Sequence, residues 1–221
     1  KKLLVEFPVS LMGREFLLGS KVVETSDMGN GPAGTMSYTP RHIKFAVVDS
    51  TLYMKEVSRT GQNMIFSSSA NQNMQEGLKK NSLSTIVDAF TIAAFNKDSS
   101  AVVVDMTSYF VSHTENMNPF SSGKRTMEYG SGRQAVKFKD DLSYLMGVKA
   151  FEDNVSIISK LTYLMNLSVG GQLVSVDEPV SITVNRTLLL LPEKPQMRPR
   201  LADPRIGIGT VAMENMGTEV D

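Results

Sequence analysis

Apolar and polar residues alternate along much of this chain, which is the pattern of strands that bury one face of a sheet. The segments with this pattern, or with many β-branched and aromatic residues, are the predicted strands: Leu3–Phe7, Arg14–Glu24, Arg41–Asp49, Thr51–Val57, Met64–Ser67, Ser84–Phe95 and Ala101–Asp105. Asp49-Ser50 separates two of them and predicts a tight hairpin turn. The first half of the chain is therefore expected to form antiparallel strands.

The clearest predicted hairpin lies later in the chain. Apolar residues occupy the odd positions of Asn154–Leu167 and the even positions of Val180–Leu191. Each strand is roughly 40 Å long at about 3.3 Å per residue, and the two bracket a Gly170-Gly171 loop. This pattern predicts a long antiparallel ribbon with one face on a core.

Helical signals are few and short. Asp105–Ser112 predicts two helical turns, and Lys139–Met146 begins with an acidic pair suited to a helix N-terminus. Three stretches are rich in Gly, Ser, Thr or Asn and are predicted loops: Ser26–Pro40, Ser68–Asn81 and Met117–Arg133. The predicted fold is mainly β, an antiparallel sandwich or a bent sheet with one or two short helices.

The tail breaks this pattern. Pro192–Gly207 carries four prolines and three arginines, so it can form neither a helix nor a central strand. We expect a β-rich domain over residues 1–191 and an extended strap over residues 192–221. The candidate functional residues of the strap are Arg198, Arg200, Asp203 and Arg205.

Three interpretations of these strap residues stay open. They can form a solvated linker with local ion pairs, each worth little. They can dock the strap on a neighbouring domain, with the arginines making bidentate contacts. In a sharper form of docking, the Asp203 carboxylate caps a catalytic metal in a neighbouring domain and displaces its water.

Composition excludes several classes of protein. The 221 residues include 23 basic and 23 acidic side chains, and this zero net charge argues against a general nucleic-acid binder. The absence of cysteine excludes disulfides and thiolate chemistry. The sequence has no run of about 18 apolar residues, which is the length that a membrane-spanning helix needs.

No catalytic, metal-binding or cofactor-binding residue is predicted in this chain. His42 is expected to be a half-exposed sheet residue, and His113 is expected to have a structural or solvated role. The adjacent carboxylates Asp140-Asp141 are interpreted as a helix cap and Glu152-Asp153 as a turn. HExxH, GxSxG and P-loop motifs do not occur. The chain alone is not expected to be an enzyme.

Three stretches resemble a known family. These are FPVSLMGREFLLGSKVVETS (Phe7–Ser26), SYLMGVKAFEDNVSIISKLTYL (Ser143–Leu164) and LLLLPEKPQMRPRLADPRIG (Leu188–Gly207). They are similar to segments of the non-catalytic β-rich region that precedes the catalytic domain in large secreted bacterial zinc-dependent metalloproteases. Glu152 departs from that pattern, where the family has proline.

The resemblance implies an accessory role. Zinc is expected in a downstream HExxH domain, which is the expected partner together with its peptide or protein substrate. The chain is expected to brace that domain, shape its cleft or impose latency, in a secreted, periplasmic or cell-surface protein whose signal peptide lies upstream. Long polar loops on a β scaffold leave open an alternative, a stand-alone surface module that binds glycan or protein. A third possibility is a soluble inhibitor or propeptide that is cleaved from the protease.

Overall fold

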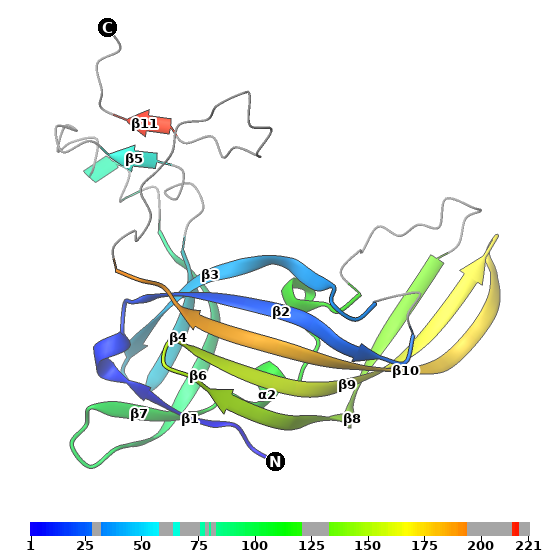
Figure 1. Ribbon diagram of the computed structural model, residues 1–221, viewed down its shortest axis with the longest axis horizontal. Coiled ribbons are helices and arrows are strands. Elements are labelled where there is room, and N and C mark those ends of the chain that lie inside the picture. The colour runs from blue at the N-terminus through cyan, green and yellow to red at the C-terminus, as the bar shows by residue number, and fades with distance from the viewer. Residues whose placement is uncertain are drawn as a thin grey trace, which may run out of the picture.

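The computed structural model describes residues 1–27, 32–57, 64–66, 76–77, 80, 83–120, 133–193 and 214–216. The strands of its main sheet are β1 (Leu4–Pro8), β2 (Glu15–Thr25), β3 (Met36–Val48), β4 (Thr51–Glu56), β6 (Thr85–Phe95), β7 (Ala101–Asp105), β8 (Arg133–Ala150), β9 (Asn154–Val169) and β10 (Gln172–Leu190). In the described part of the chain these nine strands form one antiparallel sheet in the order β1-β7-β6-β4-β3-β2-β10-β9-β8 (Figure 1). The short strands β5 (Met64–Phe66) and β11 (Glu214–Met216) pair in parallel as a separate two-stranded sheet.

The sheet curls strongly and buries its concave face. Side chains from both edge strands, Leu3 and Phe7 next to or within β1 and Leu145 in β8, belong to one buried cluster. Lys1 Nζ also donates to the Met146 carbonyl at 3.2 Å and so joins the two edges. Of the two predicted architectures, the bent sheet is confirmed and the sandwich is wrong, because the sheet packs against itself.

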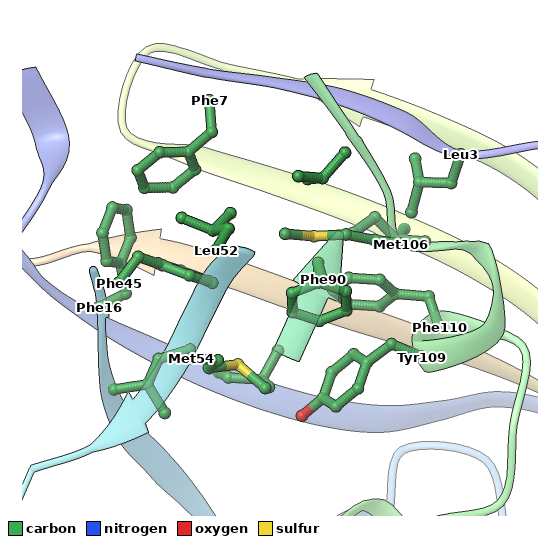
Figure 2. Packing of buried hydrophobic residues seen from close by; sticks show 14 of the residues in the cluster. Leu3, Phe7, Phe16, Phe45, Leu52, Met54, Phe90, Met106, Tyr109 and Phe110 are labelled. Carbon is green, nitrogen blue, oxygen red and sulfur yellow. The ribbon is translucent and has the colours of Figure 1, made fainter. Parts of the chain in front are cut away.

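Aromatic residues form part of the core on this concave face (Figure 2). Phe7 and Phe45 have ring centroids 4.8 Å apart, and Phe16 lies 5.7 Å from Phe45 in an edge-to-face arrangement. The three rings come from β1, β2 and β3 at inward positions of the period-two pattern. Such pairs add about 0.5–1.5 kcal/mol each beyond the area they bury.

The predicted long ribbon is confirmed. β9 and β10 pair from Leu189↔Asn154 to Gln172↔Val169. The turn uses Gly170 and Gly171 at φ 60° and 81°, left-handed values that glycine adopts without steric cost. The Asp49-Ser50 hairpin between β3 and β4 is also confirmed, with Asp49 at φ 52°.

Two predicted segments differ in the structure. The predicted helix Lys139–Met146 is wrong, since these residues lie within strand β8. Two register shifts, at Lys139/Tyr144 and Leu145/Gly147, interrupt the alternation that would have revealed a strand. The predicted loop Ser26–Pro40 is too long, because β3 already begins at Met36.

The helix predicted in Asp105–Ser112 is a single turn, α2 (Thr107–Phe110), which lies inside the curl of the sheet (Figure 1). Short 3-10 turns, η1 (Val9–Leu11) and η3 (Glu115–Met117), follow β1 and α2 along the chain. Phe110 and Tyr109 are buried in the same cluster as Phe90 (Figure 2). A helix this short is unstable alone, so tertiary contacts must hold it.

Arg186 is the main polar anchor of α2. This residue occupies an inward position of β10 and is fully buried. Its guanidinium donates to the Tyr109 carbonyl at 3.1 Å and to the Ser112 carbonyl at 2.8 Å. The Ser159 hydroxyl of β9 donates to the Phe110 carbonyl at 2.9 Å. Two strands thus satisfy the carbonyls that the last turn of a helix leaves unpaired.

We expect Arg186→Met to lower the free energy of unfolding by about 2–4 kcal/mol, measured by urea denaturation. The apolar side chain fills similar space but removes the buried hydrogen bond to the Tyr109 carbonyl and leaves the part-buried Ser112 carbonyl without its donor. Leaving an acceptor unpaired away from water costs about 1–3 kcal/mol. Lys21→Met is the control, because Lys21 is exposed on β2 and such changes stay within about 0.5 kcal/mol. If Arg186→Met is as stable as Lys21→Met, the cost of burying the Arg186 charge equals the contribution of its hydrogen bonds.

Candidate functional site

The four candidate strap residues, Arg198, Arg200, Asp203 and Arg205, lie outside the described residues. The structure describes where the chain leaves β10. Arg14 donates to the Leu191 carbonyl at 3.1 Å and pairs with the Glu193 carboxylate at 3.0 Å. The first residues after β10 are therefore attached to the start of β2.

The two histidines lie in different surroundings. His42 is half-buried in β3, as predicted, with its Nε2 atom 2.8 Å from a Glu15 carboxylate oxygen. His113 follows α2 and lies 3.3 Å from the Tyr163 hydroxyl. Within the described residues, no three His, Asp or Glu side chains come close enough to hold a metal ion.

The two carboxylate pairs have different outcomes. The Asp140-Asp141 pair caps no helix, because both residues lie in β8, where Asp141 pairs with Lys139 at 3.2 Å. The turn predicted at Glu152-Asp153 is confirmed, and its Asp153 carbonyl accepts from the Leu190 backbone.

A cluster of polar side chains lies at the edge of the aromatic core, where α2 faces β3, β4 and β6. Its members are Tyr109, Arg41, Glu56 and Asp88. Figure 2 shows the Tyr109 hydroxyl pointing out of the apolar cluster. Burial raises the pKa of Tyr109 to about 12, while the nearby Arg41 lowers it and Asp88 raises it further. Arg41 itself pairs with Glu56 at 2.6 Å. The phenol of Tyr109 is therefore neutral at physiological pH, and Arg41 is held by its pair with Glu56.

A cleft of about 510 Å³ opens beside α2. The cleft is lined by Asp105, Thr107, Ser108, Val111, Ser112, Phe138 and Asp140. Hydrogen bonds from the Thr107 hydroxyl and backbone lower the pKa of Asp105, whose carboxylate is therefore ionised at neutral pH. Volumes of this size accommodate small ligands.

Sequence reasoning did not identify this cleft. Asp105 comes from β7 and Asp140 from β8, which are far apart in the order of the sheet, and only the curl brings them together. Arg186 was also missed, although a signal existed: it is the one charged residue on the inward face of Val180–Leu190, at an even position of the predicted strand.

Exposed apolar side chains gather at the tip of the β9–β10 ribbon. Leu173, Val174 and Val176 are each more than 60% exposed, and Val169 of β9 is 42% exposed. We call these four residues the ribbon tip. Apolar groups concentrated at a projecting end are typical of a surface that packs against another protein.

In the described part of the chain, no helix is both long and apolar enough to cross a membrane. A family model described as "Domain of unknown function (DUF5117)" matches residues 34–220. No curated protein and no solved structure matches the chain.

Tyr109 generates a prediction about pH. Because its folded pKa lies above the ordinary value of 10, its contribution to stability is complete below pH 10 and is lost as the pH rises through about 12. Arg186, whose pKa burial lowers to about 10, contributes the opposite slope in this range. Wild type must therefore be compared with Tyr109→Phe.

We expect the tyrosinate absorbance that develops near pH 12 in the wild type to be smaller by one tyrosine in Tyr109→Phe. Tyr53→Phe, at a partly exposed site on β4, is the control and should keep that late amplitude. An unchanged late amplitude in Tyr109→Phe would contradict the assignment.

Proposed function

We propose that this chain, which belongs to the DUF5117 family, is a non-catalytic domain that braces the catalytic domain of a secreted zinc metalloprotease within the same polypeptide. In this proposal the zinc and the HExxH helix belong to the downstream domain, and the substrate is a peptide or protein. The resemblance of Phe7–Ser26, Ser143–Leu164 and Leu188–Gly207 to the region before such catalytic domains motivates the proposal.

The ribbon tip is the structural observation that supports bracing. β9 and β10 form a rigid ribbon whose base is part of the core, since Ile182 and Leu161 are fully buried there. Its far end carries apolar side chains that the described residues leave exposed. Covering a leucine or valine stabilises an interface by about 1.5–3 kcal/mol per side chain. A projecting apolar end on a rigid base is suited to holding a second domain in place.

The strap is the second part of this proposal. Arg14 attaches the first residues after β10 to β2, and from this fixed point the proline-rich segment continues along the chain. Proline restricts the backbone, so little entropy is lost when such a segment docks. The arginines would then contact carboxylates or carbonyls of the catalytic domain, and Asp203 would be available for latency.

The ribbon tip is tested in the full-length parent protein with Leu173→Asp/Val176→Asp. We expect the catalytic domain to melt at a lower temperature, and its peptidase activity to fall several-fold after mild heating, because two buried charges disrupt the interface. The control is Leu83→Asp/Ile86→Asp, which changes two exposed apolar residues near the start of β6.

Urea unfolding of the isolated chain distinguishes an effect of the variants on bracing from an effect on folding. Both double variants should unfold in urea like the wild-type chain, since all four side chains are exposed there. If the parent protein with Leu173→Asp/Val176→Asp behaves like its control, the ribbon tip does not brace a catalytic domain.

For the strap, we expect Arg198→Gln/Arg200→Gln/Arg205→Gln to destabilise the parent protein by several kcal/mol, because hydrogen bonds to charged groups contribute about 1.5–3 kcal/mol each. The matched control replaces the exposed lysines Lys21, Lys97 and Lys149 by glutamine. Unfolding is followed by calorimetry. Equal stability of the two triple variants would indicate a solvated linker.

A further inference from the structure

The cleft beside α2 carries an inference beyond bracing. We propose that it binds an organic cation, an alkylammonium or alkylguanidinium group. Three features of the cleft support this chemistry independently: its hydrogen-bonding atoms are mainly acceptors, its net charge is negative, and one wall is aromatic.

Two of the three hydroxyl groups that line the cleft, those of Thr107 and Ser112, already donate within the protein. The Thr107 hydroxyl donates to the Asp105 carboxylate at 2.5 Å and accepts from the Leu3 backbone at 2.7 Å. The Ser112 hydroxyl donates to the Tyr109 carbonyl at 3.1 Å. What these groups still offer a ligand is lone pairs, on Ser112 and on the Asp105 and Asp140 carboxylates. A ligand rich in N–H donors complements such a cleft.

The charge of the cleft favours a cation. Asp105 and Asp140 approach from β7 and β8, and Asp105 stays ionised at neutral pH because Thr107 stabilises its carboxylate. Two lysines lie near. Lys2 Nζ is 3.8 Å from Asp105 and largely exposed, while Lys139 is engaged by Asp141, which does not line the cleft. An exposed pair at 3.8 Å is weak, so a ligand cation can replace Lys2 at Asp105.

Phe138 supplies the aromatic wall. Its ring centroid lies 5.5 Å from that of Tyr163 and 6.5 Å from that of His113, so two other rings fix its position. A cation over the face of an aromatic ring gains electrostatic attraction, and the methylene groups beside it gain apolar contact with Phe138 and Val111. The volume of about 510 Å³ has room for the charged group together with its alkyl chain.

The test is a titration of the 221-residue chain, followed by amide chemical shifts and calorimetry. The probes are agmatine, putrescine and, as an uncharged donor of similar size, the polyol xylitol. We expect agmatine and putrescine to bind with a Kd below about 1 mM, to shift amides around Ser108, Ser112 and Phe138, and to bind more weakly at high salt. Xylitol binding as well as the cations, or no binding by either cation, would overturn the proposal.

Variants locate the site. Asp140→Asn and Phe138→Leu should each weaken agmatine at least about tenfold, the first by removing a charge and the second by removing the ring face. Asp49→Asn is the matched control, because it removes one charge at the β3–β4 turn outside the cleft, at a backbone conformation that asparagine tolerates. Equal weakening by Asp49→Asn would mean general charge attraction and would also refute the site.

A peptide comparison distinguishes the two possible sources of the cation, an arginine side chain of a protein and a free amine. Acetyl-Gly-Arg-Gly-amide is compared with agmatine, and its Gln counterpart serves as the uncharged control. Tighter binding of the Arg peptide assigns the cleft to an arginine side chain of a protein partner, whereas tighter binding of agmatine assigns it to a free amine. Both results support cation recognition, and loss of discrimination between the Arg and Gln peptides argues against it. These measurements use the isolated chain, so they are independent of bracing in the parent protein.

Discussion

Arg186 is a cation enclosed by protein whose direct hydrogen-bond partners are backbone carbonyls at the end of α2. Removing a guanidinium from water is costly, and burial lowers the pKa of Arg186 to about 10. The four-residue helix α2 has the complementary problem, because its terminal carbonyls have no partners within so short an element. The two terminal nitrogens of the guanidinium donate to these carbonyls, and the contact holds α2 inside the sheet.

α2 packs against the concave face of the curled sheet. Tyr109 and Phe110 place rings on the concave face, where strands from both halves of the sheet pack around them. The aromatic cluster of Phe7, Phe16 and Phe45 lies to one side, and a second cluster around Tyr163 lies on the ribbon side. The curl also aligns β7 with β8 across the end of α2, which creates the cleft lined by Asp105 and Asp140.

Local patterns were sufficient for most strands and for both tight turns. The inward positions of β2, β3, β4, β9 and β10 follow period two, because each of these strands has one face on the core. Strand β8 was missed for a specific reason. Ser143 accepts from the Thr162 backbone and donates to the Lys139 carbonyl, so the chain bulges there and its side chains change face. A pattern with such shifts resembles a short helix in the sequence.

The sequence by itself determined the β class, the long ribbon and the outward or inward direction of most side chains, because alternation is a local property of an extended backbone. The sequence also separated the proline-rich tail from the strands, since proline restricts the backbone of its own residue and of the residue before it. Tertiary structure alone decided the single curled sheet, the burial of Arg186 and the cleft. Each of these joins residues that are distant along the chain, and pairing between distant strands depends on the shape of the whole core, which no local period encodes.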